Sequence, residues 1–158
     1  MQGVVRDERH NRARAFIERV GLGSFAASYP HELSVGMRQR VGIARAFVAD
    51  AHMLLMDEPF GSLDAQTRRV LQEELLRLWR DHQKLVVYVT HDIEEAILLG
   101  DRVLVMTGRP GRIREEIPVP LGRPRDLAGD EQPDIARIER HIWKMLEEEV
   151  RKSLWIRD

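Results

Sequence analysis

Three carboxylates occur close together in the stretch LLMDEPFGSLDA, residues 54–65. Asp57 and Glu58 are adjacent at the end of an apolar run, and Asp64 follows a Gly-Ser turn. Because adjacent residues of a strand point to opposite faces, one of the paired carboxylates can serve a metal ion while the other faces an attacking water. Phosphoryl transfer needs this division, since magnesium neutralises phosphate oxygens while a base aligns the nucleophile. A strand that simply ends in acidic residues before a loop is the plain alternative.

A histidine follows the next long apolar run of the chain. His91 comes directly after LVVYVT, residues 85–90, much as Asp57 ends HMLLMD, residues 52–57. The carboxyl ends of neighbouring parallel strands meet at one edge of a sheet, where ligands bind in open α/β folds. We therefore expect His91 to share a site with Glu58. An ordinary loop histidine is the alternative.

A second polar cluster lies in LSVGMRQRVGIARAF, residues 33–47. Ser34 and Gly36 stand where apolar residues at helical spacing begin, so they open a helix. Free backbone N–H groups and the positive end of the helix dipole favour an anion there. The sequence therefore predicts that this helix start binds a phosphate group, and the alternative is that Ser34 only caps the helix. The remaining histidines have no metal-ligand spacing and are expected at the surface: His10, His31, His52, His82 and His141.

The segments that carry these groups predict an α/β fold. Continuous apolar runs are typical of strands buried on both faces, and Leu71, Leu75 and Leu78 mark a helix between two of them. The order strand, helix, strand implies a parallel crossover. We expect parallel strands at 52–57, 85–90 and 102–106, an edge strand in RIREEIPV, residues 112–119, and helices at about 8–20, 36–49, 65–81 and 134–150.

Composition restricts the class of protein. The 158 residues are 43% hydrophobic and 32% charged, enough for one globular domain with a core, and no apolar run is long enough to cross a bilayer. The start MQGVVRDERHNR lacks the pattern of a secretory signal, and the absence of cysteine excludes disulfides and fits a reducing, cytosolic setting. The net charge of −1 argues against a sequence-independent binder of nucleic acid.

Four motifs together resemble the ATP-binding subunits of ABC transporters, and the resemblance covers nearly the whole chain. LSVGMRQRVGIARAF is similar to the family signature and its helix, LLMDEP to the Walker B strand, GSLDA to the D-loop, and VTHD to the switch-histidine loop. The implied fold is a partial P-loop NTPase fold. It is an α/β fold with a parallel sheet flanked by helices and part of the helical subdomain at the N-terminus. The implied cofactors are ATP and Mg²⁺.

The resemblance assigns catalytic roles to three residues. Asp57 would hold magnesium through water. Glu58 would act as the catalytic base. His91 would contact the terminal phosphate and sense its loss.

The resemblance also implies that Ser34 and Gly36 bind ATP held by a partner subunit, and that Asp64 communicates across the dimer interface. The signature departs from the family's commonest pattern, which has two glycines after the serine and then a glutamine. Met37 in place of the glutamine is familiar in one importer branch, whereas Val35 in place of the first glycine restricts the backbone. Either the backbone at Val35 is ordinary and only Ser34 and Gly36 matter, or the site is weakened.

The family's phosphate-cradling loop, Gly-x-x-x-x-Gly-Lys followed by Ser or Thr, does not occur in the sequence. The lysines are Lys84, Lys144 and Lys152, and none follows a glycine. That loop, the aromatic residue that stacks on adenine and the glutamine loop would all lie upstream of Met1. We therefore expect a carboxyl-terminal part of a longer protein, inactive as an ATPase alone because the phosphates are neither bound nor aligned.

Three segments are expected along the chain. Residues 1–50 would be a helical-subdomain remnant with the signature motif and its helix. Residues 51–120 would be the catalytic α/β core with Walker B, the D-loop and the switch histidine. Residues 121–158 would be a linker and a C-terminal helix.

Longer matches favour one branch of the family. DEPFGSLDAQTR, THDIEEAILLGDRV and TGRPGRIREEIPV with a later RPRD are similar to the ATPases of nitrate, sulfonate and taurine importers. The resemblance implies an ATP-hydrolysing subunit at the cytoplasmic face of the cell membrane that powers uptake of a small anion. The implied partners are a second ATPase subunit, a transmembrane permease and, indirectly, a periplasmic or lipid-anchored solute-binding protein, with no nucleic acid. The alternatives are a non-catalytic module that pairs with a full-length ATPase, and a soluble non-transport ABC ATPase.

Overall fold

The structure is a computed structural model, and it describes residues 5–49, 51–123, 125 and 133–155. Two compact units make up the chain, Met1–Val89 and Thr90–Asp158. Each unit has its own two-stranded sheet.

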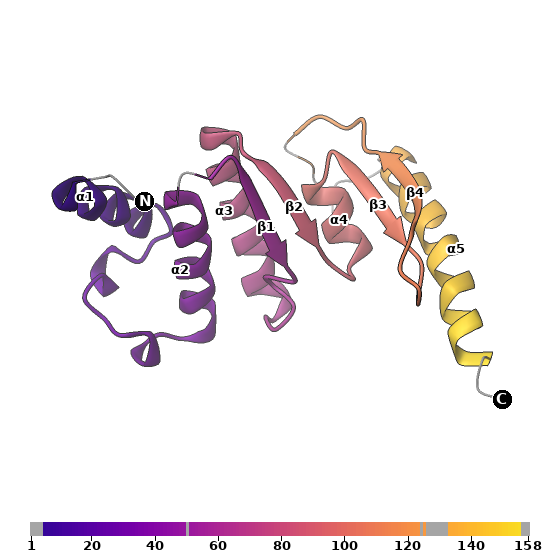
Figure 1. Ribbon diagram of the computed structural model, residues 1–158, viewed down its shortest axis with the longest axis horizontal. Coiled ribbons are helices and arrows are strands. Elements are labelled where there is room, and N and C mark those ends of the chain that lie inside the picture. Colours follow the sequence, from indigo (N-terminus) through magenta and orange to yellow (C-terminus); the bar gives the residue numbers. More distant parts are fainter. Residues whose placement is uncertain (1–4, 50, 124, 126–132, 156–158) are drawn as a thin grey trace. The chain divides into compact units, whose positions relative to one another are not determined.

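The first unit begins with helices (Figure 1). Helix α1 packs on α2, and α1 is followed by Gly21, whose φ of +71° places it in the left-handed region that glycine adopts without strain. Helix α2 begins directly after its predicted cap, Ser34. The bounds are α1 Arg6–Arg19, the short 3₁₀ helices η1 Gly23–Phe25 and η2 Pro30–Glu32, and α2 Val35–Val48.

A strand, a helix and a second strand complete this unit, as predicted. They are β1 Met53–Asp57, α3 Ala65–His82 and β2 Leu85–Val89. Strands β1 and β2 pair in parallel, from Met53 opposite Leu85 to Asp57 opposite Val89. Gln83, with φ +41°, caps the C-terminal end of α3. The Trp79 indole N–H donates to the Lys84 carbonyl at 2.9 Å, which fixes the turn into β2.

Within the described residues, one face of the β1–β2 sheet is covered and the other is exposed, so the prediction of strands buried on both faces is wrong. Leu54 and Met56 of β1 are buried, and they alternate with exposed residues, of which Leu55 is 74% exposed. A continuous apolar run does not say whether both faces are covered, and here the period-two alternation of a half-covered sheet applies. The exposed apolar side chains of this face are Met53, Leu55, Leu85, Val87 and Val89.

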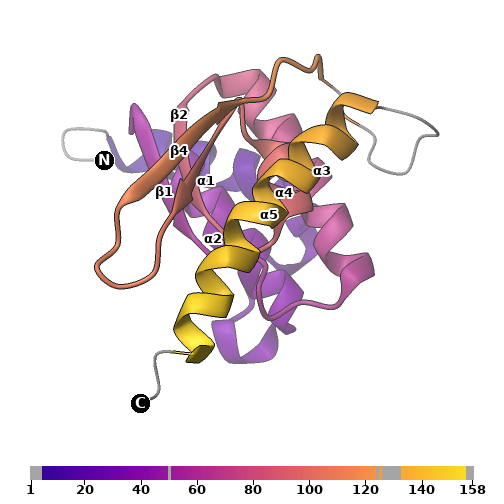
Figure 2. The ribbon, with the colours of Figure 1, turned by 90° about the vertical axis from the view of Figure 1, so that its right-hand side faces the viewer.

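The second unit contains α4 Ile93–Leu99, β3 Arg102–Met106, β4 Ile113–Pro118 and α5 Pro133–Trp155. The strand predicted at 102–106 is present, but its parallel pairing is wrong, because β3 pairs antiparallel with β4. Helix α5 lies beside this hairpin and α4 in Figure 2. A single apolar core joins α4, both strands and α5 through Ile97, Val105, Ile117, Val119, Ile135, Ile138, Ile142 and Met145.

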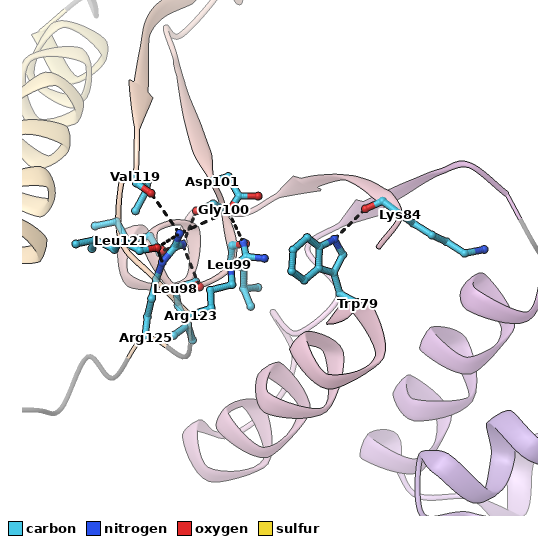
Figure 3. A network of polar contacts seen from close by, with 11 residues as sticks. Trp79, Lys84, Leu98, Leu99, Gly100, Asp101, Val119, Leu121, Arg123 and Arg125 are labelled. Carbon is cyan, nitrogen blue, oxygen red and sulfur yellow. Dashed lines mark hydrogen bonds and ion pairs between the residues drawn. The ribbon is translucent and has the colours of Figure 1, made fainter. Parts of the chain in front are cut away.

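A buried arginine holds the end of α4 in place (Figure 3). The Arg125 side chain is 1% exposed and lies 3.5 Å from the Asp101 carboxylate. Burial lowers the pKa of Arg125 from its usual value. Arg123 donates to the Leu99 carbonyl and pairs with Asp101 at 2.9 Å. The guanidinium of Arg125 donates to the main-chain carbonyls of Ile97, Leu98, Gly100, Val119 and Leu121.

Candidate functional site

An open pocket of about 350 Å³ lies in the first unit, where α2 and α3 begin. It brings together Ser34, Gly36 and Asp64, which the sequence singled out separately. Its lining consists of Ser34, Val35, Gly36, Met37, Arg40, Ser62, Leu63, Asp64 and Thr67.

Two capped helix starts form the polar part of this pocket. The Ser34 hydroxyl accepts a hydrogen bond from the Met37 N–H at 3.2 Å. The Asp64 carboxylate accepts one from the Thr67 N–H at 3.0 Å. The Thr67 main-chain and side-chain hydrogen bonds lower the pKa of Asp64 from its usual value, so the group is an anion at neutral pH. Both helix dipoles present their positive ends here.

The two helix starts touch where Gly36 faces Thr67. A methyl group built on Gly36 would lie 3.2 Å from Thr67 Cγ2. Such a distance is tighter than an ordinary contact, so glycine at this position allows the two helices their close approach. Packing thus couples the predicted signature segment to the predicted D-loop segment.

Arg40 adds a positive charge to the pocket and was not predicted as a site residue. It lies one helical turn after Gly36 on α2, and its guanidinium donates to the Val20 carbonyl at 3.5 Å. Its Nε is buried without a hydrogen-bond partner among the described residues. The one-turn spacing from Gly36 was the available signal in the sequence. A guanidinium beside two helix N-termini suits a phosphate group.

Val35 occupies an ordinary backbone conformation. It is the first residue of α2 and is 48% exposed. Among the described non-glycine residues, only Glu58 and Gln83 have positive φ values, so the position of Val35 does not require glycine. The backbone therefore accommodates valine, and Val35 is one of the residues that line the pocket.

The paired carboxylates lie at the carboxyl end of β1, as predicted, and both are exposed. The Glu58 N–H donates to the Val89 carbonyl at 2.9 Å, continuing the pairing of β1 with β2. Glu58 has φ +42°, a left-handed conformation that costs a non-glycine residue about 1–3 kcal/mol. Backbone strain of this kind concentrates at functional sites, where it fixes the direction of a side chain.

Asp57 offers a single carboxylate for a cation. Among the described residues, no group of three or more His, Asp or Glu side chains is arranged to hold a metal ion. Magnesium fits such a position because it keeps several waters and needs only one or two protein carboxylates when a substrate supplies phosphate oxygens.

His91 lies in the second unit and is exposed. It directly precedes Asp92, whose carboxylate caps α4 by accepting from the Glu95 N–H at 3.1 Å. The histidine therefore stands at the start of a capped helix. Its shared site with Glu58 stays a prediction. The other histidines are exposed, as expected: His10, His31, His52, His82 and His141.

No helix in the described part of the chain combines the length and the apolar character that crossing a membrane requires.

Comparisons with known proteins place these motifs in one family. The family profile described as ABC transporter matches residues 2–61. An uncharacterized ABC transporter ATP-binding protein of Methanocaldococcus jannaschii is 47% identical over 154 residues, which cover 98% of this chain and 57% of the relative. A taurine import ATP-binding protein of Rhizobium johnstonii is 55% identical over 111 residues, covering 70% of this chain and 42% of the relative.

Other similar proteins are also ABC transporter components or import ATP-binding proteins by name. A nitrate import ATP-binding protein of Synechocystis is 43% identical over 132 residues, covering 84% of this chain and 47% of the relative. The solved structure of cbiO1 from Clostridium perfringens, described as part of the ABC transporter complex cbiONQ, matches with a TM-score of 0.59 at 27% identity, covering 65% of this chain and 41% of that one. The chain spans about half the length of the curated relatives that it matches. With a partial P-loop NTPase fold and relatives along nearly its whole length, the chain belongs to the ATP-binding proteins of ABC transporters.

Proposed function

We propose that this chain serves as an ATP-binding and ATP-hydrolysing subunit of an ABC importer for a small anion. The observation that carries the proposal is the pocket that joins Ser34, Gly36 and Asp64 at two helix starts. An anion finds free N–H groups, two helix dipoles and the Arg40 guanidinium there. The import names of the relatives, for taurine, nitrate and aliphatic sulfonates, support the kind of cargo.

The anion in this pocket is the terminal phosphate of ATP bound by a second ATPase subunit. Ser34 and the first N–H groups of α2 contact the phosphate oxygens, and Arg40 balances their charge. Asp64 is itself an anion, so like-charge repulsion keeps it off the phosphate. Its remaining acceptor capacity is directed at polar groups of the partner subunit at the dimer interface.

The carboxylates of Asp57 and Glu58, at the end of β1, act on the ATP of their own subunit. Asp57 would hold Mg²⁺ through water, and the bound ion would supply positive charge to the phosphate oxygens. Glu58 accepts the proton of the attacking water, and its strained backbone fixes the direction of the carboxylate. His91 donates a hydrogen bond to the terminal phosphate and senses its loss.

The assembly around this subunit follows from the same proposal. The partners are a second ATPase subunit, a transmembrane permease and, indirectly, a solute-binding protein. The chain works at the cytoplasmic face of the cell membrane as a peripheral subunit. The chain has three functional segments in this proposal. They are the signature-bearing segment at residues 1–50, the catalytic core at residues 51–120 and the C-terminal segment at residues 121–158.

A second function, that of a non-catalytic partner module, is favoured by the lysines. None of Lys84, Lys144 and Lys152 follows a glycine, and Lys84 Nζ donates to the Phe47 carbonyl at 3.1 Å. These lysines supply no phosphate-cradling loop. In this case the 158-residue chain hydrolyses no ATP alone and offers Ser34 and Asp64 to a complete ATPase.

The test of the main proposal is a hybrid cassette. The part of the Methanocaldococcus jannaschii relative that lies outside its match to this chain is joined to residues 1–158, and Mg²⁺-dependent phosphate release is measured. Glu58→Gln should retain ATP binding and lower phosphate release about 10²–10⁴-fold, because the amide cannot accept the proton. Glu73→Gln, an exposed carboxylate of α3, is the matched control and should keep the rate. Equal rates for the two variants would remove Glu58 from the mechanism.

A further inference from the structure

Helix α5 carries a second, outward-facing stripe opposite the stripe that fills the core. Its inner residues Ile135, Ile138, Ile142 and Met145 are buried. The outer residues recur at spacings of four, three, four and three, the pattern of a seam between paired helices. They are Ala136, Arg140, Trp143, Glu147 and Val150.

This outer stripe is open. Trp143 is 60% exposed and Val150 is 54% exposed, whereas a large aromatic side chain usually contributes its area to a core or an interface. Arg140 has no ion-pair or hydrogen-bond partner within the described part of the chain. Glu147 accepts from Arg151 on its own helix at 2.7 Å and keeps 44% of its side chain exposed, so it can accept a further bond.

The stripe is complementary to its own reverse, because reversing it places a charge of opposite sign at each charged position. Trp143 stands at the centre, Arg140 and Glu147 lie on either side of it with opposite charges, and Ala136 and Val150 form the apolar ends. An isologous two-fold contact requires that residue i of one copy meets residue j of the other and the reverse. A stripe with this order meets that requirement only when the two helices run antiparallel.

We propose that the outer face of α5 docks on the same face of a second copy of this chain, with the helices antiparallel and Trp143 near the two-fold axis. Each Arg140 then meets the partner's Glu147, each Ala136 meets the partner's Val150, and the two indoles pack on each other. A parallel pair would place Arg140 on Arg140 and Glu147 on Glu147, which like-charge repulsion disfavours. The pairing needs no nucleotide and so stands apart from the proposed function.

The contact is small and therefore weak. Two tryptophans bury about 300–500 Å² together, which is below the roughly 1,000 Å² of a stable specific interface. We expect the 158-residue chain to self-associate without nucleotide with a Kd of about 100 μM, which is typical of a weak, transient complex. Sedimentation velocity at several concentrations measures it.

Charge reversal tests the register. Arg140→Glu alone and Glu147→Arg alone should each weaken self-association about tenfold, because two symmetry-related pairs turn repulsive. An equimolar mixture of the two variants should regain the wild-type affinity, since every contact then joins opposite charges. The control Arg12→Glu on α1 changes the net charge by as much as Arg140→Glu does, and it should leave the self-association affinity unchanged. A mixture no tighter than the single variants would overturn the proposal.

A second measurement does not depend on affinity. The sequence contains no cysteine, so single introduced cysteines report proximity. Chains with Arg140→Cys mixed with chains with Glu147→Cys should form the mixed disulfide dimer faster than either forms a dimer with itself. Equal rates for all pairings, as expected from unspecific association or from a different partner on this face, would also overturn the proposal. Circular dichroism confirms that each variant keeps its helices.

Discussion

Gly36 at the start of α2 and Thr67 near the start of α3 face each other so closely that a methyl group on Gly36 would lie 3.2 Å from Thr67 Cγ2. This contact makes one pocket from two segments that are about 30 residues apart in the sequence. A larger residue at position 36 would therefore press on the Thr67 methyl group.

The first prediction follows from that contact. Gly36→Ala should strain the helix pair, and Thr67→Ser, which removes the methyl group that it meets, should relieve the strain. We expect a favourable coupling free energy of about 1 kcal/mol between the two substitutions in urea unfolding. Since alanine also raises helix propensity, only the double-mutant cycle isolates the contact. Additive effects would mean that the helices adjust without cost.

The second prediction concerns the left-handed backbone of Glu58. Glu58→Gly and Glu58→Ala both remove the carboxylate, but only glycine adopts φ +42° freely. The glycine variant should be more stable than the alanine variant by about 1 kcal/mol. Thermal unfolding of the two proteins compares them, and an alanine variant of equal or higher stability would show that the backbone is unstrained.

The third prediction concerns Arg125, which donates to main-chain carbonyls at the end of α4 and in the segment after β4. Arg125→Met should lower the free energy of unfolding by about 3–5 kcal/mol, because buried carbonyls lose their donors. The control is Arg102→Met, which breaks an exposed pair with Glu116 and should cost less than about 1 kcal/mol. Similar costs for the two variants would contradict a central role for Arg125.

The fourth prediction uses the lowered pKa of Asp64, whose usual value is 3.8. Hydrogen bonds from Thr67 favour the charged form in the folded state, so this carboxylate stabilises the fold above pH 3.8, and the contribution is lost as pH falls through the lower folded pKa. Asp64→Asn keeps a capping oxygen but has no charge to titrate. The stability advantage of the wild type over this variant should shrink below about pH 3.8. An advantage that grows in acid would contradict the assignment.

Periodicity and capping predicted most of the secondary structure. Ser34 and Asp64 both cap the helices that the sequence suggested, since a cap is a local interaction between neighbours in sequence. Helix α4 was missed because its seven residues are too few to show a helical period, although Asp92 is a recognisable cap.

The pairing of strands and the membership of the pocket depend on distant contacts. Strand β3 has an apolar run like that of β1, yet it pairs antiparallel with β4, and nothing in the run itself specifies its neighbour. Thr67 joined the site only through packing of α2 against α3. Sequence spacing identifies groups that one element carries, whereas contacts between elements need the fold.

The most direct test is whether the pocket at Ser34 binds the terminal phosphate of ATP that a second subunit holds. The Rhizobium johnstonii taurine import protein, with the glutamate that aligns with Glu58 changed to glutamine so that ATP persists, is mixed with this chain, and complex formation is followed by light scattering. We predict that a complex forms with Mg²⁺-ATP and does not form with ADP. Ser34→Glu should abolish the complex, because it places a carboxylate in the anion site. The exposed control Ser24→Glu should leave the complex intact. A complex that forms equally with ADP, or that Ser34→Glu leaves unchanged, would contradict the account.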